Sequence, residues 1–381
     1  MKVLVLGTAY PWRGGIAHYI GLLAKYLSAC FSVDVVTFSR QYPKLFFPGK
    51  SQNELGDFGV PLHTEMLIDS INPLNWIRVG LKLMRRNYDV VIFKYWLPFF
   101  GPCFGTICHI IKFKKNTIVL AICDNVIPHE RRIGDKLFTC YAFSSVDGFL
   151  VQSDAVAKDL KRLLPDAKYC RVEHPVYEIF GNAIDKSEAR ANLGLKNDRI
   201  ILFFGYIRSY KGLDILLEAM NIILLHIDVQ LLVIGEFYED EERYHELTKT
   251  LGVAHRVNFV SEYAPNDKVA LYFSAADCVV LPYRSATQSG IVQIAYNFNK
   301  PVIVTQVGGL AEVVKDGVTG FIVPPDDPIA LADAVIKFYS SNYEQQFFEE
   351  IQHEKKRFSW QTLVDNIDAF VKEIQNEKVK A

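Results

Sequence analysis

The sequence lacks several features that would assign it to common classes of protein. Its seven cysteines are an odd number and include no Cys-x-x-Cys pair, which argues against a disulfide framework or a zinc site and favours a reducing, cytoplasmic compartment. No stretch of about 20 uninterrupted apolar residues occurs, and the apolar run at the start is too short for a signal peptide. Asp-x-Asp motifs are also missing, so we expect neither a bound metal ion nor another cofactor.

The net charge is small, at −1, but it is unevenly distributed. Residues 1–174 contain 22 Lys and Arg against 14 Asp and Glu, whereas residues 175–381 contain 20 against 29. The basic half is either a partner for an anionic acceptor or membrane surface, or the product of ordinary variation. We expect no nucleic-acid partner. The cations of the first half include three close groups, namely Lys82, Arg85 and Arg86; Lys112, Lys114 and Lys115; and Lys158, Lys161 and Arg162.

Length and hydrophobic rhythm predict two α/β domains. A chain of 381 residues, half of them hydrophobic, can form two domains with separate cores. Short apolar runs separated by helix-length segments predict doubly wound parallel sheets. The expected strands are residues 3–7, 33–38, 89–93, 117–123 and 148–152 in the first domain, and 200–205, 229–235, 257–260, 278–282, 301–305 and 320–323 in the second.

We place the domain boundary between residues 174 and 175. The second domain then covers residues 175–356. The terminal segment, residues 357–381, has helical spacing and carries large aromatic side chains. Because such side chains must be buried somewhere, we expect this helix to pack back on the first domain.

Two segments of the first domain are harder to interpret. Residues 40–75 have no clean period and contain four prolines, so we expect a long, partly irregular excursion. Residues 95–111 carry no formal charge and are flanked by Lys94 and Lys112. They form either an interfacial membrane segment or a buried helix that covers the sheet, and we favour the buried helix.

Residues 200–220 predict an anion-binding site. An apolar run ends at Gly205, and apolar residues at helical spacing begin at Leu213. Arg208 and Lys211 lie in the loop between this strand and this helix. A helix N-terminus offers unpaired N–H groups and the positive end of the helix dipole. Two added cations would suit a diphosphate, and the alternative is an ordinary solvated loop.

Two further loops of the second domain follow strands in the same way. Residues 283–290 are polar and precede an apolar helix over 291–298, and residues 305–312 contain a glycine pair. The carboxyl ends of parallel strands lie at one edge of a sheet, so these loops should lie beside the Arg208–Lys211 loop and form an anion or polyol site. The candidate residues in them are Gln288, Ser289, Gly290, Gln293 and Glu312.

The first domain contributes two candidate sites at strand ends. Gly14 and Gly15 separate the first strand from a helix, and they either let a ligand approach the backbone or only tighten the turn. Asp124 and His129 belong to a polar cluster that follows the strand ending at Cys123. This is where open α/β sheets bind ligands, although Asp, Asn and Pro are also ordinary turn residues.

Together these residues resemble the family 4 glycosyltransferases, retaining enzymes with the GT-B fold, in which two Rossmann-like domains face a central cleft. The resemblance rests on Gly14-Gly15 with residues 16–18, then on residues 125–130, 151–153, 205–213, 282–283, 300–303, 308–312 and 316–321. It implies transfer of a sugar, of the hexosyl type, from a nucleotide-sugar donor. The donor would bind mainly to the second domain. The acceptor would be a glycan or a polyprenyl-diphosphate-linked sugar, as in bacterial-type polysaccharide or glycolipid synthesis.

The resemblance also implies roles for residues. Arg208 and Lys211 would hold the donor diphosphate, and Gly15 would let the donor approach from the first domain. Two departures from the family pattern stand out. Ala286 and Ile294 occupy places where the family often has glutamates, so that Gln288, Ser289 and Gln293 are the nearby polar substitutes. Asp124 stands where a histidine is common.

The chemistry agrees with this resemblance, but other functions remain open. Breaking a sugar–diphosphate bond needs stabilisation of charge on the leaving phosphate, which cations and helix N-termini supply without a metal. We assign no covalent nucleophile. A non-catalytic nucleotide-sugar-binding module is a second hypothesis, motivated by the two departures. A nucleotide-sugar epimerase of the same fold is a third, although it would need a richer set of carboxylates and histidines. We expect a cytoplasmic protein, and the sequence leaves open whether it is peripheral on the inner face of the membrane or whether its basic groups only form solvated surface.

Overall fold

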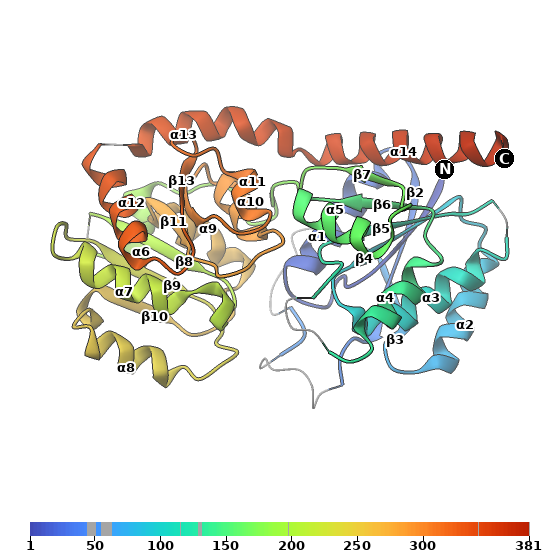
Figure 1. The fold of residues 1–381 in the computed structure, drawn as a ribbon, viewed down its shortest axis with the longest axis horizontal. Helices are drawn as coiled ribbons and strands as arrows, with labels where there is room; N and C mark the ends of the chain where they lie inside the picture. Colours follow the sequence, from blue (N-terminus) through green and yellow to red (C-terminus); the bar gives the residue numbers. More distant parts are fainter. Residues whose placement is uncertain are drawn as a thin grey trace. The chain divides into compact units, whose positions relative to one another are not determined.

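The computed structural model describes residues 1–43, 51–54, 63–114, 116–128, 132–196, 198–341 and 343–380. This part of the chain forms two compact units (Figure 1). The first unit contains the described residues up to Pro175 together with those from Ser359 onward, and the second contains Val176–Phe358. The division therefore lies one residue beyond the expected boundary at 174/175, and helix α14 (Trp360–Lys380) is part of the first unit.

The first unit is built on a parallel sheet of seven strands in the order β3-β2-β1-β4-β5-β6-β7. Buried, β-branched runs form its centre, because a strand covered by helices on both faces needs apolar side chains on both. The strands are β1 (Lys2–Leu6), β2 (Ser32–Arg40), β3 (Thr64–Asp69), β4 (Val90–Tyr95), β5 (Ile118–Cys123), β6 (Gly148–Val151) and β7 (Tyr169–Arg171).

Strands β3 and β7 at the two edges of this sheet were not predicted. The segment of residues 40–75, expected as a long, partly irregular excursion, contains β3 and the start of helix α2 (Pro73–Met84), which that expectation did not locate. Most β3 residues are only partly buried, and β7 has three residues, none of them fully buried. Edge strands of this kind carry neither a continuous apolar run nor a clear alternation, so their sequences give little signal.

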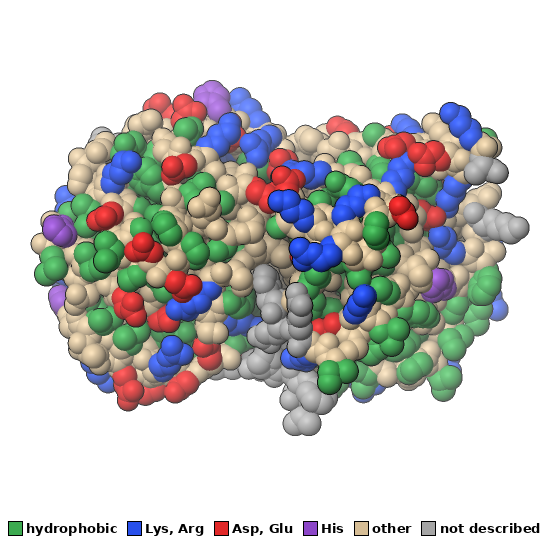
Figure 2. All heavy atoms as spheres, viewed as in Figure 1, with side chains coloured by type: hydrophobic (Ala, Val, Ile, Leu, Met, Phe, Trp, Pro, Cys, Tyr) green, Lys and Arg blue, Asp and Glu red, His purple; other side chains and the backbone are tan. Residues whose placement is uncertain are grey.

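Six helices complete the first unit within the residues that the structure describes. They are α1 (Gly15–Ser28), α2, α3 (Gly101–Ile111), α4 (Asp135–Phe143), α5 (Asp154–Leu163) and α14. Helix α3 contacts α2 on one side and α4 on the other. Hydrophobic side chains of this layer are visible at the lower right of Figure 2, below the basic and acidic groups of the same unit.

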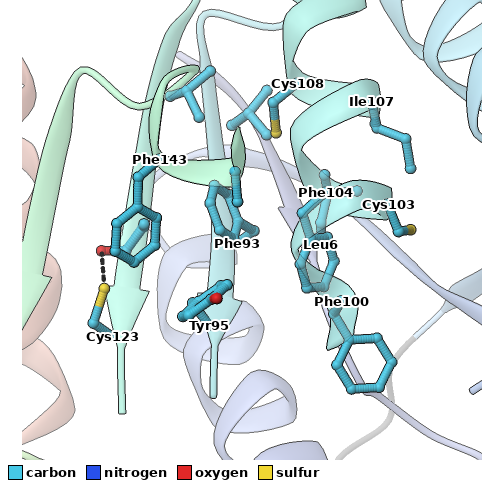
Figure 3. Close-up of a cluster of buried hydrophobic side chains, with 14 of the residues drawn as sticks. Leu6, Phe93, Tyr95, Phe100, Cys103, Phe104, Ile107, Cys108, Cys123 and Phe143 are labelled. Carbon is cyan, nitrogen blue, oxygen red and sulfur yellow. Dashed lines mark hydrogen bonds between the residues drawn. The ribbon is translucent and has the colours of Figure 1, made fainter. Parts of the chain in front are cut away.

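Residues 95–111 form the buried helix that the sequence favoured. Tyr95 ends β4, Pro98–Phe100 form a short 3₁₀ turn, and α3 follows. Phe104 stacks on Phe93 with 5.2 Å between ring centroids, and Phe100 and Ile107 are buried in the same cluster (Figure 3). The sheet therefore covers these aromatic side chains, and the interpretation of the whole segment as an interfacial membrane helix is wrong.

Aromatic contacts hold helix α14 on the first unit. The Trp360 ring is fully buried. It meets the Tyr19 ring edge-on, with 5.0 Å between centroids, and stacks on Tyr26 at 6.0 Å. Both tyrosines belong to α1, so this helix supplies the cover that the terminal aromatics require.

The second unit has a parallel sheet of six strands in the order β10-β9-β8-β11-β12-β13. The strands are β8 (Ile200–Phe204), β9 (Gln230–Ile234), β10 (Val257–Val260), β11 (Cys278–Leu281), β12 (Val302–Thr305) and β13 (Gly320–Val323), each within one residue of its expected bounds. The helices are α6 (Lys186–Asn192), α7 (Leu213–Ile223), α8 (Glu242–Thr250), α9 (Asn266–Ala275), α10 (Gly290–Asn297), α11 (Leu310–Val313), α12 (Pro328–Ser340) and α13 (Tyr343–Glu354).

A buried carboxylate at the amino end of β11 ties several elements of the second unit together. The Asp277 side chain accepts hydrogen bonds from Lys186 at 2.8 Å and from Arg190 at 2.7 Å, both on α6. It also accepts from the Tyr339 hydroxyl at 2.9 Å and from the backbone N–H of Ile200 at 2.7 Å. Asp277 therefore joins α6, α12 and β8, and its charge is balanced only while all these partners remain.

We predict that Asp277→Ala lowers the free energy of unfolding by about 3 kcal/mol, because removing one member of a buried ion cluster leaves the others uncompensated. Urea denaturation followed by circular dichroism measures this change. Asp333→Ala is the matched control, since Asp333 is exposed on α12 and should change stability by less than about 0.5 kcal/mol. Equal stability of the two variants would contradict the prediction.

Candidate active site

The predicted loops of the second unit lie together at one edge of its sheet. They follow β8, β11 and β12, which are neighbours in the sheet. Glycines with positive φ allow the loops to touch. A Cβ atom on Gly212 would lie 2.0 Å from the Pro282 carbonyl oxygen, and one on Gly308 would lie 1.6 Å from the Ala286 carbonyl oxygen. No other residue fits at either position, so the three loops form one continuous surface.

Lys211 is the centre of this surface. It ends a 3₁₀ turn (Ser209–Lys211) just before α7 and is 8% exposed. A Cβ atom placed on Gly205 would lie 2.9 Å from the Lys211 Nζ atom and 3.4 Å from the side chain of Ile291 on α10. The structure thus brings together Gly205, Lys211 and the first turn of α10, as the sequence predicted.

The ammonium group of Lys211 is buried without a counter-charge. Among the residues that the structure describes, no side chain accepts a hydrogen bond from it. Its Nζ atom lies 5.4 Å from the centroid of the Tyr283 ring. Burial, and then repulsion by Arg208, lowers the pKa of Lys211 to about 7. A bound anion would supply the missing charge, which makes this position a candidate phosphate site.

Arg208 lies beside Lys211 and is held by aromatic side chains. Its guanidinium carbon is 5.0 Å from the centroid of the Tyr238 ring, and Tyr238 in turn packs on Tyr206 at 4.6 Å. A guanidinium stacked in this way keeps its N–H edge available for an anion. The two cations of the predicted anion site therefore occupy one loop, one buried and one partly exposed.

Arg284 is a structural cation of the site that the sequence did not single out. Its guanidinium donates two hydrogen bonds of 2.9 Å to the Asp214 carboxylate, one of 2.7 Å to Asp326 and one of 2.7 Å to the Ser209 carbonyl oxygen. The backbone N–H of Arg284 also donates to the Tyr210 carbonyl oxygen. Arg284 thus fixes the Arg208–Lys211 loop against the loop after β11.

The polar residues of the loop after β11 have mixed environments. Ser289 caps α10, since its hydroxyl accepts from the backbone N–H of Ile291 at 3.3 Å. Gly290 lies against the Tyr177 ring, and a Cβ atom placed on Gly290 would lie 3.1 Å from that ring. Gln288 is partly buried in the same loop. These residues line the start of α10, so part of their role is to build that helix end.

The two apolar residues that stand where the family often has glutamates are buried in the structure. Ala286 and Ile294 are buried, at 9% and 6% exposure. Gln293, beside Ile294, is 1% exposed, and its side-chain oxygen has no hydrogen-bond partner in the described part of the chain. Glu312 is partly buried in the first turn of α11, after β12. No carboxylate therefore replaces the two family glutamates at their own positions.

Gly14 and Gly15 form the beginning of α1 in the first unit. Gly14 has φ +102°, a conformation that favours glycine, and it precedes the helix without a capping side chain. Gly15 is the exposed first residue of the helix. The first turn of α1 contains no acidic residue. The positive end of the helix dipole at this position is consistent with the predicted approach of an anionic ligand.

Asp124 pairs with a buried lysine, which the sequence analysis noted only because it flanks the uncharged segment 95–111. Lys94, on β4, is 2% exposed and donates a hydrogen bond of 2.6 Å to the Asp124 carboxylate. Its Nζ atom also lies over the Tyr19 ring, 3.5 Å from the centroid. Asp124 follows β5, the neighbour of β4, so the pair lies at the carboxyl edge of the sheet. The other candidate of this loop, His129, is outside the described residues.

Neutral groups complete the surroundings of this pair. The Gln152 amide donates to the Tyr19 hydroxyl at 3.0 Å. His174 packs edge-on against the Tyr19 ring at 5.2 Å. Burial, and then the charge of Lys94, lowers the pKa of His174 to about 3. His174 is therefore neutral at physiological pH, and Asp124 is the anionic group of the cluster.

Comparison with known proteins agrees with this geometry. Solved structures share the fold: sucrose-phosphate synthase from Thermosynechococcus elongatus superimposes with a TM-score of 0.76 at 19% identity, covering 98% of both chains. Anabaena HepE in complex with UDP-glucose gives 0.71 at 18% identity, covering 98% of this chain and 100% of the other. The fold is GT-B, which confirms the fold class expected from the sequence.

Comparison of sequences identifies more specific similarities than the shared GT-B fold. Residues 185–355, within the second unit, match the family model described as "Glycosyl transferases group 1". D-inositol 3-phosphate glycosyltransferase 1 of Catenulispora acidiphila is 35% identical over 162 residues, 40% of this chain and 38% of the relative. The Corynebacterium diphtheriae D-inositol 3-phosphate glycosyltransferase is 29% identical over 198 residues, 50% and 46% of the two chains. The chain thus spans about half the length or less of these curated relatives. Over its second unit the chain is therefore similar to glycosyl transferases of group 1.

The Lys94–Asp124 pair predicts a specific pattern of stability. Asp124→Asn leaves a buried ammonium without its anion and should lower the free energy of unfolding by about 3 kcal/mol. Lys94→Met/Asp124→Asn removes both charges and should recover much of that loss. Urea denaturation of the wild type, both single variants and the double variant measures the coupling. Additive effects of the two substitutions would mean that the ion pair does not stabilise the fold.

Proposed function

We propose that this protein transfers a sugar from a nucleotide-sugar donor to a glycan or lipid-linked acceptor with retention of anomeric configuration. The observation that carries the proposal is the buried, unpaired ammonium of Lys211, set beside Arg208 at the start of α7. A diphosphate is the simplest ligand that would satisfy two adjacent cations and a helix N-terminus at once. The similarity of residues 185–355 to group 1 glycosyl transferases supports this choice.

In the proposed reaction the bond between the sugar anomeric carbon and the diphosphate oxygen breaks. The acceptor hydroxyl forms the new bond on the same face of the sugar, and its proton passes to the departing phosphate oxygen. Lys211 and Arg208 stabilise the charge that develops on that oxygen, because preorganised cations in a poorly solvated site act strongly on it. In this proposal the two cations do the work that a metal ion does elsewhere, and no cofactor is required.

The donor sugar is assigned to the loops beside Lys211. Gly205 leaves space for the ammonium, while Gln288, Ser289 and Gly290 form the start of α10 beside it. Gln293 brings a buried amide oxygen that lacks a partner among the described residues. We propose that a donor hydroxyl meets this polar group or Glu312, in place of contacts with the missing family glutamates.

The first unit is assigned to the acceptor side. Gly14 and Gly15 would let the donor approach, and Asp124 would contact the reacting sugars as the anionic group beside Lys94. His129 stays a prediction from the sequence. The UDP-glucose complex of HepE and the inositol-phosphate acceptors in the names of the curated relatives support, respectively, a nucleotide-sugar donor and an anionic acceptor.

Peripheral attachment to the inner face of a membrane belongs to the same proposal. None of the helices in the described part of the chain is long and apolar enough to cross a bilayer. A polyprenyl-diphosphate-linked acceptor would be presented at such a surface, so the enzyme would work beside the membrane from the cytoplasm.

The proposal predicts large losses when either cation is removed. Arg208→Ala and Lys211→Ala should each lower turnover by roughly 10²–10³, the usual effect of removing one electrostatic contact to developing charge. Release of nucleoside diphosphate from a panel of nucleotide-sugars measures turnover. Lys268→Ala, an exposed lysine on α9, is the matched control. Near wild-type rates in both site variants would place the reaction elsewhere, and binding without turnover in the wild type would favour the non-catalytic alternative.

Lys211 also predicts a pH dependence of ligand binding. Its pKa of about 7 in the free protein should rise when a diphosphate binds, because the anion favours the charged form. Affinity for nucleoside diphosphate should therefore be full below pH 7 and fall as the pH rises above it, with proton uptake on binding. Calorimetry in two buffers of different ionisation enthalpy measures that uptake. Lys211→Met should abolish it, and unchanged uptake in this variant would assign the proton to another group.

A further inference from the structure

Exposed apolar side chains are concentrated on one part of the first unit. Most of the exposed large hydrophobic residues of the described chain fall between residues 66 and 141, and they include Met66, Ile71, Leu74, Ile77, Leu81, Phe113, Ile133, Leu137, Phe138 and Tyr141. Leu74 and Leu137 are 73% and 69% exposed. A soluble surface rarely leaves so many large apolar side chains in one region, so this region is a candidate for contact with a partner.

Six of these residues belong to α2 and α4, which α3 joins into one layer, and the others lie in or beside the segments next to these helices. Glycines bring the helices close together. A Cβ on Gly80 of α2 would lie 2.9 Å from the Ile110 side chain of α3, and one on Gly105 of α3 would lie 2.8 Å from the Tyr141 ring of α4. The Thr106 hydroxyl also meets the Tyr141 hydroxyl at 3.0 Å. We call this layer the α2–α4 face, and its hydrophobic side chains gather at the lower right of Figure 2.

The outer side of α2 combines apolar and basic residues at helical spacing. Leu74, Ile77 and Leu81 are exposed along one side, while Val79 and Leu83 point into the core. Exposed Arg78 lies on the same outer side, and exposed Arg85 lies one turn beyond Leu81. Neither arginine has an ion-pair partner among the described residues. An amphipathic helix with leucines flanked by free cations is the pattern of helices that lie in a lipid interface.

The charges around the face have one dominant sign. Helices α2 and α3 contain no acidic residue, and α4 contains only Asp135, in its first turn next to exposed Lys136. Four of the cations that the sequence proposed for membrane contact form ion pairs in the structure. Glu65 pairs with Lys82 and Arg86, and other pairs join Lys112 to Asp147 and Arg162 to Asp159. Lys115 is outside the described residues. The attraction therefore has to come from the unpaired cations at this face.

We propose that the α2–α4 face docks on an anionic lipid bilayer, with Leu74, Ile77, Leu81 and Leu137 entering the headgroup region. Lipid is favoured over a second copy of the chain, because a two-fold interface would bring the same unpaired cations against each other. An anionic bilayer offers both an apolar interior and a compensating charge. The inference rests on the membrane attachment in the proposed function and assigns a surface to it, and it uses no residue of the candidate active site.

Vesicle flotation tests the proposal. The full chain should float with vesicles of mixed phosphatidylcholine and phosphatidylglycerol, and binding should fall as salt is added. Leu74→Ser and Leu137→Ser should each weaken binding by roughly tenfold, because each removes one large apolar side chain from the interface. Arg78→Glu/Arg85→Glu should abolish the preference for anionic lipid. All four positions are exposed, so the variants should unfold at the wild-type denaturant concentration.

Matched controls separate this surface from general effects. Leu225→Ser removes an equally exposed leucine of the second unit, at 78% exposure, and Lys268→Glu reverses an exposed cation there; both should float like the wild type. Release of nucleoside diphosphate from soluble substrates should be unchanged in every variant, which keeps this test separate from that of the proposed activity. Wild-type binding by the Leu74 and Leu137 variants would overturn the proposal. So would absence of flotation combined with self-association that these variants abolish.

Discussion

The candidate site depends on a cation that the fold buries without giving it a partner. Desolvation of an ammonium is costly, and the protein lowers that cost by letting the pKa of Lys211 fall to about 7. The position is maintained by its surroundings, because Gly205 vacates the space that the ammonium occupies and Ile291 limits the space beside it. An ammonium held in this way is ready for an anion that enters from outside.

Close contacts between loops make this arrangement possible. Parallel strands deliver their carboxyl ends to one edge, but side chains on the loops would keep them apart. Gly212 and Gly308 remove that obstacle at the two points where a loop meets a neighbouring carbonyl oxygen. Arg284 then fixes the loops by charge-assisted hydrogen bonds to Asp214 and Asp326. The strand order brings the three loops near each other, and the glycine and Arg284 contacts fix the positions of their side chains.

The sequence predicted the central strands because they are continuous apolar runs, and it predicted Arg208 and Lys211 because both are local to a strand–helix junction. It could not predict the edge strand β3, whose side chains are only half-buried. Nor could it predict the partners of Arg284 and Lys94. Asp214 is 70 residues away from Arg284, and Asp124 is 30 residues away from Lys94. Ion pairs between residues so far apart in the chain depend on the order of the strands, and no hydrophobic periodicity in the sequence indicates them. The ion pairs of Lys82, Arg86 and Lys112 could not be predicted for a related reason, since groups of cations in the sequence say nothing of the carboxylates that fold onto them.

The two buried lysines show how the fold distinguishes structure from function. Lys94 has a carboxylate 2.6 Å away and an aromatic ring beneath it, so its charge is satisfied before any ligand arrives. Lys211 has the Tyr283 ring, Gly205 and the Ile291 side chain around it, with a second cation nearby. Since both lysines are buried, at 2% and 8% exposure, burial alone does not mark a binding site. What marks it is the missing counter-charge, because a group that the protein leaves unsatisfied at a strand end gains the most from an incoming phosphate. By this criterion Lys211 marks the candidate anion site in the second unit, whereas Lys94 holds Asp124 in place.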